Sequence, residues 1–465
     1  MTSERQLALP NDLLHLSQAD PEVYELLQEE RERQRDSIDL IASENMASLA
    51  TLEALGSVFT NKYSEGYPGR RYYGGCDVID KVERLCIKRA LQAFNLNPEE
   101  WGVNVQPLSG SPANLEVYVA LLQPHDKIMG LRLSSGGHLT HGFHVGQKKI
   151  SASAVFYTPL LYDVDKETGL LDYDEIEKLA KAYNPRLIIA GASCYSRYWD
   201  YKRCREIADK VGAYLMADMA HIAGLIAGKE HPSPFEYCHV VTSTTHKTLK
   251  GPRHGLIYYS KKVDPPIEDK INSAVFPTMQ GGPHNNTIAA LAVQLKTVIS
   301  PEWKLYAKGI VDNARRLAAE CEKRGFLVVT GGTDNHTIVI NLKPFGVNGN
   351  KAEHICNGIN IAVSKSTVPG DVSAMNPSGL RLGTALITAR GGKPDDMVFI
   401  ADALLEMIRI CQSLQGGLCN IIFYVFTEAH GTNHEDFKKG SEGDERISAL
   451  RTKVREWIRQ FPIVS

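Results

Sequence analysis

Lys247 lies where a lysine can do covalent chemistry. It follows the β-branched run 240–245, which is typical of a buried strand, and it precedes the turn signal Gly251-Pro252. An open α/β sheet binds its ligands just past the ends of such strands. There an amine becomes a nucleophile if burial or a nearby cation removes its proton. Because most lysines are simply solvated, the neighbouring motifs must decide between a nucleophile and a surface lysine.

Asp218 is expected at the same edge of the sheet as Lys247. Strand and helix patterns alternate in this region, which predicts parallel strands joined by crossover helices. The expected strands are 187–190, 214–217 and 239–242, with a helix at 202–211. Alone, Asp218 is equally well explained as a turn or helix-capping acid. Together with His221 and Lys247 on one edge, it indicates a site.

The run Ser109-Gly110-Ser111-Pro112 predicts an anion site. It separates a strand candidate at 103–107 from a helix whose apolar residues recur at helical spacing. Ser111 suits the helix cap and Pro112 the first helical position. Backbone N–H groups and the positive end of the helix dipole meet there, which favours a phosphate. Many capped helices bind nothing, so this motif counts only with the others.

Arg381 interrupts a short apolar run at 378–384. An arginine in such a place either pairs with a structural acid or awaits a ligand carboxylate, which a guanidinium binds with two parallel hydrogen bonds. Both alternatives stay open from the residues alone.

Three histidines, His138, His141 and His144, recur every third residue. Such a cluster could hold a metal ion. Glycines at 136, 137 and 142 break helical regularity, and no carboxylate follows nearby. We therefore predict no metal, and expect a histidine that packs on a ring or is satisfied by hydrogen bonds.

Residues 61–75 form a loop rich in Tyr, Arg, Gly and Pro. Interleaved Tyr and Arg could suggest single-stranded nucleic acid, but the net charge of −2 argues against that partner. A loop that lines a small-molecule site or a subunit contact is favoured.

Length and composition predict an ordinary soluble protein of two or three domains. The chain has 465 residues, 43% of them hydrophobic, and no apolar run of membrane-spanning length. Nine scattered cysteines without a C-x-x-C pair, and a start without signal- or transit-peptide character, indicate a reducing, cytoplasmic location. We expect an N-terminal arm and helix at 1–42, a large domain at 43–295 and a smaller α+β domain at 296–465.

These groups together match the needs of pyridoxal phosphate. A lysine links to the cofactor, and an acid keeps the pyridine nitrogen protonated so that the ring accepts electrons. A helix N-terminus holds the phosphate, and an arginine holds the carboxylate of an amino acid.

The sequence also resembles the serine hydroxymethyltransferases, a family of fold-type-I pyridoxal-phosphate enzymes, over about residues 10–460. The motifs that carry the resemblance are Leu-Ile-Ala-Ser-Glu-Asn at 40–45, Asn-Lys-Tyr-Ser-Glu-Gly-Tyr-Pro-Gly at 61–69, Arg-Tyr-Tyr-Gly-Gly at 71–75, Gly-Gly-His-Leu-Thr-His-Gly at 136–142, Asp-Met-Ala-His at 218–221, Thr-Thr-His-Lys-Thr-Leu at 244–249 and Gln-Gly-Gly-Pro at 280–283. The resemblance implies a large domain with a mostly parallel seven-stranded sheet between helices, and a smaller C-terminal α+β domain.

The resemblance further implies roles for individual residues. The implied catalytic residues are Lys247, Glu65, Asp218, His138, Tyr73 and Thr244. The implied cofactor-binding residues are Tyr63, Ser109, Gly110, Ser111, His138, Ser193, Asp218, His221, His246, Lys247 and Gly282. Substrate-binding positions are Ser43, Glu65, Tyr73 and Arg381, and folate-binding positions are Tyr72, Leu133, Gly137, Leu139 and Ser366.

The implied reaction interconverts L-serine plus tetrahydrofolate with glycine plus 5,10-methylenetetrahydrofolate, through an external aldimine and a glycine quinonoid. Tyr63 and Gly282 are implied to reach the phosphate bound by the neighbouring subunit. An obligate homodimer with shared active sites is therefore implied, and a tetramer stays possible.

Two alternatives remain. A related pyridoxal-phosphate aldolase acting on β-hydroxy amino acids without folate would retain Lys247 and Asp218 but need no pterin pocket. Ser366 stands where the family favours asparagine, which keeps this alternative open, while Glu65 favours the folate enzyme. The second alternative, a catalytically silent scaffold or RNA-binding relative, is disfavoured by the intact lysine, aspartate and phosphate turn.

Overall fold

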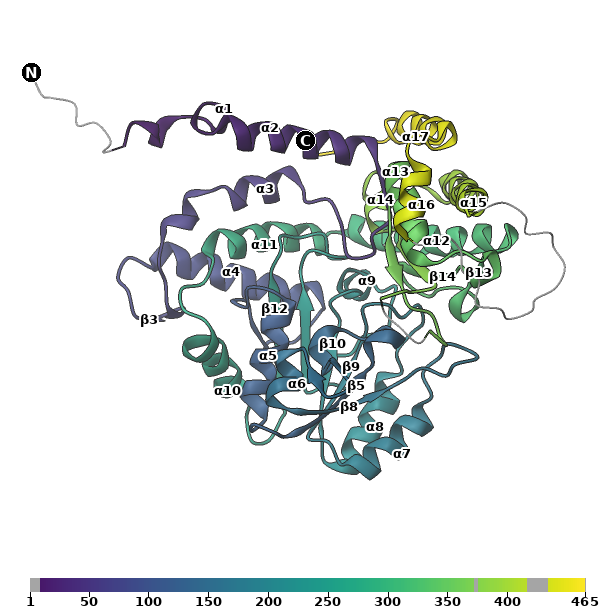
Figure 1. Ribbon diagram of the computed structural model, residues 1–465. Helices are drawn as coiled ribbons and strands as arrows, with labels where there is room; N and C mark the ends of the chain where they lie inside the picture. Colours follow the sequence, from purple (N-terminus) through teal and green to yellow (C-terminus); the bar gives the residue numbers. More distant parts are fainter. Residues whose placement is uncertain (1–8, 372–374, 416–433, 465) are drawn as a thin grey trace, which may run out of the picture.

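The computed structural model describes residues 9–371, 375–415 and 434–464. Within these residues the central feature is a seven-stranded sheet in the order β4-β12-β11-β10-β9-β5-β8 (Figure 1). β12 is antiparallel to both neighbours, and the other pairs are parallel. The strands are β4 Trp101–Asn104, β5 Lys127–Leu131, β8 Thr158–Tyr162, β9 Leu187–Gly191, β10 Tyr214–Asp218, β11 Val240–Thr244 and β12 Gly255–Ser260. The predicted α/β class and mostly parallel sheet are confirmed.

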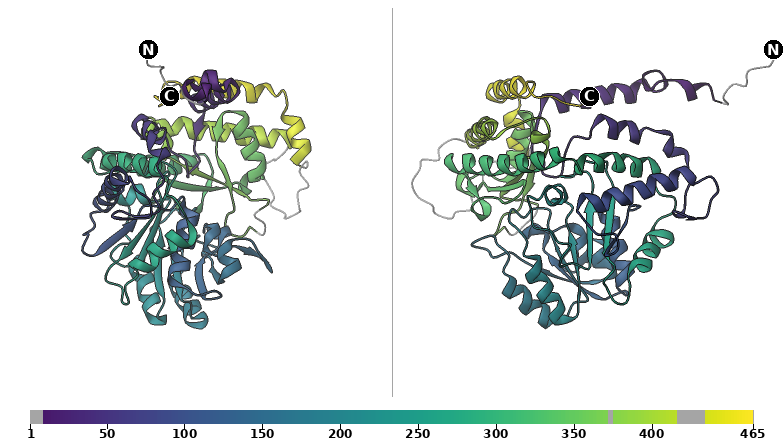
Figure 2. Two further views of the ribbon diagram at one scale, coloured as in Figure 1. Left: turned by 90° about the vertical axis from the view of Figure 1, so that its left-hand side faces the viewer. Right: turned by 180° about the vertical axis from the view of Figure 1, so that it is seen from behind.

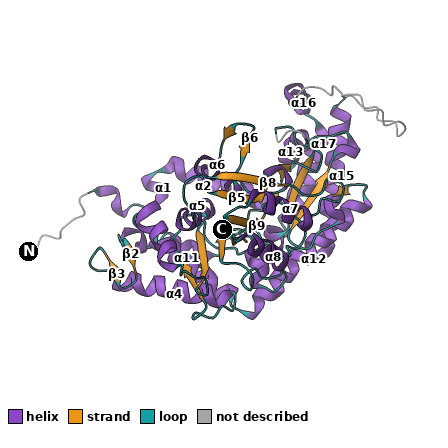
Figure 3. Cartoon of the chain, turned by 90° about the horizontal axis from the view of Figure 1, so that it is seen from below, coloured by secondary structure: helices purple, strands orange, loops and turns teal. Residues whose placement is uncertain are grey.

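Both faces of this sheet are buried under helices (Figure 3). Along β9, Ile188 and Ala190 enter one core while Leu187 and Ile189 enter the other. A slip of one residue would exchange the two sets, so the register is strongly specified. Helices on the first face are α4 Asp77–Ala93, α7 Tyr173–Tyr183, α8 Tyr201–Val211, α9 Ala223–Ala227 and α11 Asn285–Val298; α5 Gly110–Leu121 and α10 Glu268–Ser273 lie on the second.

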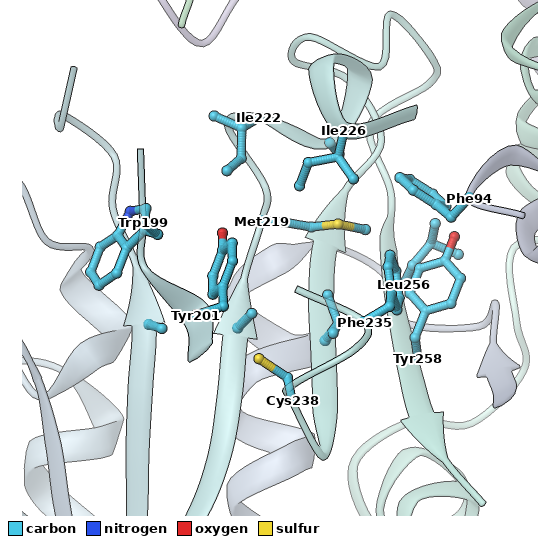
Figure 4. Packing of buried hydrophobic residues seen from close by; sticks show 14 of the residues in the cluster. Phe94, Trp199, Tyr201, Met219, Ile222, Ile226, Phe235, Cys238, Leu256 and Tyr258 are labelled. Atoms are coloured by element: carbon cyan, nitrogen blue, oxygen red, sulfur yellow. The ribbon is translucent and has the colours of Figure 1, made fainter. Parts of the chain in front are cut away.

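Aromatic side chains fill one end of the first core. Figure 4 shows Phe94, Phe235 and Tyr258 packed together, with ring centroids 5.2–5.5 Å apart. Edge and tilted contacts of this kind add about 0.5–1.5 kcal/mol per pair to the burial of the rings. This packing fixes β12 against the helices beside it.

The C-terminal part forms a second core around a four-stranded sheet of order β13-β14-β17-β16. Its strands are β13 Leu327–Val328, β14 Thr337–Asn341, β16 Ser364–Ser366 and β17 Gly379–Gly383. Its helices are α12 Pro301–Lys323, α13 Gly349–Gly358, α15 Met397–Leu414, α16 His434–Ser441 and α17 Glu445–Ile458. α12 contributes Ala307 to the first core and Leu317 to the second. The domain boundaries at 42/43 and 295/296 stay predictions.

Two stretches differ from what their sequence patterns predict. The apolar pattern running from Ile288 into Ala319 predicts one long helical stretch, but α11 ends at Val298 and α12 begins at Pro301. Proline cannot continue a helix but suits its first position. The polar composition of 430–445 predicts a mobile stretch, yet α16 forms there with Phe437 only 1% exposed. Residues 430–433 lie outside the described residues.

The N-terminal arm runs along the outside of the molecule (Figures 1 and 2). α1 Leu16–Ala19 leads to α2 Pro21–Asp36, where the Asp20 carboxylate accepts a hydrogen bond from the N–H of Val23. Neither helix buries a residue in this chain, and Leu26 and its apolar neighbours are exposed. The chain then returns through β1 Ile38–Asp39, which pairs with β15 Ile361–Ala362.

The remaining elements are short. They are α3 Leu49–Leu55, β2 Gly66–Tyr67, β3 Arg70–Arg71, β6 His144–Val145, β7 Lys148–Lys149, α6 Ala152–Phe156 and α14 Ala385–Ala389. Across the described ranges, every helix falls short of the length and apolar character needed to cross a bilayer.

Candidate functional site

A cavity of about 470 Å³ opens where the parallel strands end. Its volume is typical of small-molecule and cofactor sites, which measure about 300–1,000 Å³. The lining residues are Ser43, Glu44, Ser109, Gly110, Ser111, Asn114, His138, Ala192, Ser193, Asp218, Ala220, His221, Thr244, His246, Lys247, Arg253 and Arg381. A larger cavity of about 820 Å³ lies at the opposite strand ends, near Trp101 and Tyr214, and contains none of the predicted site residues.

Lys247 lies in the turn after β11 and is 9% exposed. Burial lowers the pKa of its amine to about 8; the charge of Asp218 opposes this shift, and Arg381 reinforces it. A larger neutral fraction near neutral pH makes the amine a better nucleophile. The Asn45 side-chain amide donates to the Lys247 carbonyl over 3.0 Å, which ties the turn to the segment that carries Ser43.

Asp218 ends β10 and is held by three donors. Its carboxylate accepts from Asn114 Nδ2 at 2.9 Å and from the Ala220 N–H at 3.1 Å, and it lies 3.0 Å from His141 Nε2. His141 Nδ1 accepts the backbone N–H of His138, so Nε2 carries the proton and donates to Asp218. Burial alone would raise the pKa of Asp218, but the hydrogen bond from His141 and the charge of Lys247 hold it well below its usual value. Asp218 is therefore ionised at physiological pH.

His138, His141 and Asp218 form the one group with metal-ligand character found among the described residues. Their ligand atoms lie within 4.8 Å of one another. Hydrogen bonds inside the chain already engage these atoms, because His138 Nδ1 accepts the N–H of Thr140 at 3.2 Å. Burial also lowers the pKa of His138 to about 4, which leaves a neutral ring beside the cavity. The absence of a metal stays a prediction.

The start of α5 presents unsatisfied groups to the cavity. Within the described part of the chain, the hydroxyls of Ser109 and Ser111 have no hydrogen-bond partner, and Ser109 does not cap its own helix. A side chain at Gly110 would meet the Thr244 methyl group at 2.6 Å, so only glycine fits. His246 Nδ1 is buried without a partner, and burial lowers the pKa of this ring to about 3. The cradle suits an anion with several acceptor oxygens.

Arg381 reaches the cavity from β17 of the C-terminal sheet. Its Nη1 donates to the Ser193 carbonyl at 3.1 Å, and its Nη2 lies 3.4 Å from Ser364 Oγ. Its Nε is buried without a partner. No carboxylate among the described residues pairs with this guanidinium, so a ligand carboxylate, rather than a structural acid, is the remaining alternative.

His221 lies at the junction of the two sheets. Its ring stacks on His336 with centroids 5.5 Å apart, and its Nδ1 is 3.3 Å from His336 Nε2. His336 Nε2 also donates to the Ala42 carbonyl at 3.1 Å. Burial holds the pKa of His221 well below its usual value, so the ring is neutral. It joins the cavity wall to the segment before Ser43.

The structure does not bring Tyr63, Glu65, Tyr73 and Gly282 into the cavity; they form a separate cluster. The rings of Tyr63 and Tyr73 meet edge-on with centroids 5.2 Å apart. A side chain at Gly282 would lie 2.9 Å from the Tyr63 ring. Tyr63 and Tyr73 are 54% and 45% exposed. The implied service of Tyr63 and Gly282 to the neighbouring subunit stays a prediction.

The predicted folate residues lie in more than one place in this chain, although the segment of Ser366 meets the turn of Leu133 and Gly137, where Thr367 donates to the Ser134 carbonyl at 2.9 Å. Tyr72 is 76% exposed and packs edge-on against Phe276. Leu139 lines another cavity, which is apolar and measures about 480 Å³. The Ser366 hydroxyl donates to the Thr367 carbonyl at 3.2 Å. Two further positions, Leu133 and Gly137, lie in the turns after β5.

Four residues at the site escaped the sequence reasoning. Asn114, His141 and Thr242 orient Asp218, since Thr242 donates to Asn114 Oδ1 at 2.6 Å and Asn114 and His141 contact the carboxylate. Arg253 lines the cavity and has no ion-pair partner among the described residues. Only proximity to a motif marked them: Asn114 follows the Ser-Gly-Ser-Pro turn, and Arg253 follows Gly251-Pro252.

Comparison with known proteins identifies the family. A family model described as serine hydroxymethyltransferase matches residues 16–404. The chain belongs to the serine hydroxymethyltransferase family. Curated relatives with this name span nearly the whole chain. The rabbit (Oryctolagus cuniculus) cytosolic serine hydroxymethyltransferase is 50% identical, over 99% of this chain and 95% of its own length. The Caenorhabditis elegans serine hydroxymethyltransferase is 49% identical, over 97% of this chain and 89% of its own length. The cytosolic protein of Eremothecium gossypii is 47% identical, over 97% and 96%.

Membership of the serine hydroxymethyltransferase family confirms the resemblance drawn from the motifs, and it agrees with the observed α/β fold. The roles of individual residues rest on the geometry above.

Proposed function

We propose that this protein is an enzyme that interconverts L-serine plus tetrahydrofolate with glycine plus 5,10-methylenetetrahydrofolate, with pyridoxal phosphate as cofactor. One observation carries the proposal: a lysine and an aspartate, each with a lowered pKa, line a single cavity beside an anion cradle whose donors are unengaged. Lys247 and Asp218 are the two residues concerned. The family names of the relatives support the reaction.

The residues present fit pyridoxal phosphate. Ser109, Ser111, His246 and Arg253 offer unengaged donors for the phosphate. Asp218, already anionic, would hold the pyridinium N–H of the cofactor, and the neutral His138 ring would pack against the cofactor ring. When bound, the cofactor supplies an electron sink for the carbanion left after a bond to the substrate Cα breaks.

The chain's own groups then bind the amino acid and move protons. Arg381 holds the substrate carboxylate through its Nε, which has no other partner, and through the N–H groups of its other two nitrogens that are still free. Ser43 lies beside it in the cavity wall. Lys247 provides the nucleophilic amine and, once released, can take or return a proton at the substrate Cα. Glu65 takes or returns the proton of the serine hydroxyl as the hydroxymethyl group leaves toward the folate, and Tyr73 lies beside it.

The active site is shared between two copies of the chain. Glu65, Tyr63, Tyr73 and Gly282 form a cluster outside the cavity, so a second copy delivers them. The exposed apolar residues of the arm are suited to cover the same partner. The protein is a homodimer, or a tetramer built from such dimers. The rabbit and Eremothecium gossypii relatives are named cytosolic, which supports a cytoplasmic location.

The reaction is tested by adding serine to the purified protein with and without tetrahydrofolate and measuring glycine release. Rapid release is expected only with tetrahydrofolate, because the hydroxymethyl carbon needs an acceptor. Equal release with and without folate would favour the aldolase alternative.

The shared site is tested with hybrids of Lys247→Ala and Glu65→Gln chains. Lys247→Ala alone is expected to be inactive, and Glu65→Gln alone to keep only a small but measurable rate of folate-dependent glycine release. A hybrid dimer has one site in which both residues are intact, so hybrids purified from co-expressed chains should recover about half of the wild-type rate per hybrid dimer. Mass spectrometry verifies that hybrid dimers have formed. If these hybrids were as inactive as the two parent variants, the shared site would be contradicted.

A further inference from the structure

Arg71 is almost fully buried between two acids. Its side chain is 4% exposed, its Nε donates to Asp80 at 2.9 Å, and its Nη2 donates to Glu83 at 2.6 Å. Both acids lie on α4, which packs against the central sheet. The guanidinium is therefore anchored to a rigid helix by two charge-assisted hydrogen bonds.

The third nitrogen of Arg71 holds the backbone around Glu65. Its Nη1 donates to the Ser64 carbonyl at 2.9 Å and to the Gly66 carbonyl at 2.7 Å, the two peptide groups that flank Glu65. The Glu65 carbonyl itself accepts the N–H of Tyr72 at 3.1 Å. Three successive carbonyls are thus fixed, two of them by one side chain.

Gln106 reinforces the same clamp. Its Nε2 donates to the Gly66 carbonyl at 3.0 Å and to Glu83 at 2.9 Å. Gly66 has φ +95°, a conformation that other residues rarely adopt, so the backbone turns sharply directly after Glu65. The direction of the Glu65 side chain is set by this turn.

We propose that Arg71 is a positioning residue that aims Glu65 at the substrate of the neighbouring subunit. The proposal rests on the role of Glu65 in the proposed function. A planar guanidinium is required, since one group reaches two carboxylates and two carbonyls at fixed angles, whereas an ammonium has three donors and no fork. The acids serve to orient Arg71 and take no part in the chemistry.

A double-mutant cycle tests this proposal in the cofactor-loaded protein. Arg71→Lys is expected to lower folate-dependent kcat by about 10- to 100-fold, because misplacement by about 1 Å costs that much. Glycine affinity, read from the cofactor spectrum, should change by less than about 3-fold. In a Glu65→Gln background the same change should lower kcat by less than about 3-fold, since the group that Arg71 positions has lost its function.

Arg84→Lys is the matched control. Arg84 lies 3.5 Å from the same Asp80 but is 57% exposed and makes no contact with the Glu65 backbone, so kcat should stay unchanged. Equal losses from Arg71→Lys with and without Glu65 would overturn the positioning role, as would a parallel loss of glycine affinity. Wild-type protein without folate-dependent release would instead overturn the proposed function.

Gln106→Met provides a second test if Arg71→Lys folds poorly. It removes one of the two donors to the Gly66 carbonyl and leaves the Arg71 ion pairs in place. A smaller loss of kcat, about 3- to 10-fold, is expected with glycine affinity retained, and it should vanish in the Glu65→Gln background. A loss that persists in that background overturns the proposal.

Discussion

Replacing Lys247 by alanine is expected to abolish the visible absorbance of lysine-linked pyridoxal phosphate and to lower glycine release by a factor of about 10⁴ or more. Loss of a covalent nucleophile is among the largest single-residue effects known in enzymes. The cavity leaves no equivalent amine, because Lys247 is the one lysine among its lining residues. Absorbance spectra of the purified variant, with added cofactor, give the first readout.

Lys250→Gln is the control for this change. Lys250 lies three residues on in the same turn, burial also lowers its pKa, and its amine lies 5.4 Å from the centre of the Tyr306 ring. The account predicts that this variant keeps both the absorbance and the turnover. If Lys247→Ala kept the absorbance while Lys250→Gln lost it, the assignment of the nucleophile would be wrong.

Asp218→Asn is expected to lower turnover by about 10³-fold, while the protein still folds. Asp218 accepts hydrogen bonds from His141, Asn114 and the Ala220 N–H, and its pKa lies well below the usual value. An amide offers only one acceptor oxygen and turns an NH₂ group toward these donors. It also removes the charge that keeps the pyridine nitrogen protonated, an electrostatic loss of the kind that costs about 10²–10⁴-fold. Steady-state kinetics across the neutral pH range measure the effect.

The loss should not depend on pH. Because the folded-state pKa of Asp218 is depressed, wild-type Asp218 is ionised throughout the neutral range. No pH in that range makes the wild-type side chain neutral like the asparagine of the variant. Asp163→Asn is the control, since Asp163 also follows a parallel strand but pairs with Arg132 at the surface. Comparable losses in both variants would indicate a general effect of carboxylates at this edge of the sheet.

The convergence of Lys247 and Asp218 could be predicted from sequence because parallel strands end at one edge. The strand candidates 214–217 and 239–242, in a region where strand and helix patterns alternate, suffice to place both residues together. A helix start in the turn at 109–112 also followed from local signals, but the helix begins at Gly110, two residues before the first position predicted at Pro112. In each case the residues that determine the local structure lie close to the motif in sequence.

The supporting residues could not be predicted in this way. His141 had seemed one of three spaced histidines, but it orients Asp218 through Nε2, a contact across 77 residues. Arg253 and Asn114 likewise enter the site through tertiary packing that no local pattern encodes. Arg381 stood out in the sequence as a charge in an apolar run. The structure was needed to show that, among the described residues, no acid pairs with it.

The cluster around Glu65 illustrates a different limit. Its residues are locally ordered by Arg71, yet the chemistry proposed for them depends on a second copy of the chain. Neither periodicity nor a single subunit contains that information; only the family resemblance pointed to it.

Chemical trapping of the cofactor tests the central claim most directly. The protein loaded with pyridoxal phosphate is reduced with borohydride, which fixes the cofactor to its amine, and the modified peptide is located by mass spectrometry. The account predicts a pyridoxyl group on Lys247 in nearly every chain. A group on Lys250 or on another lysine, with Lys247 unmodified, would contradict it.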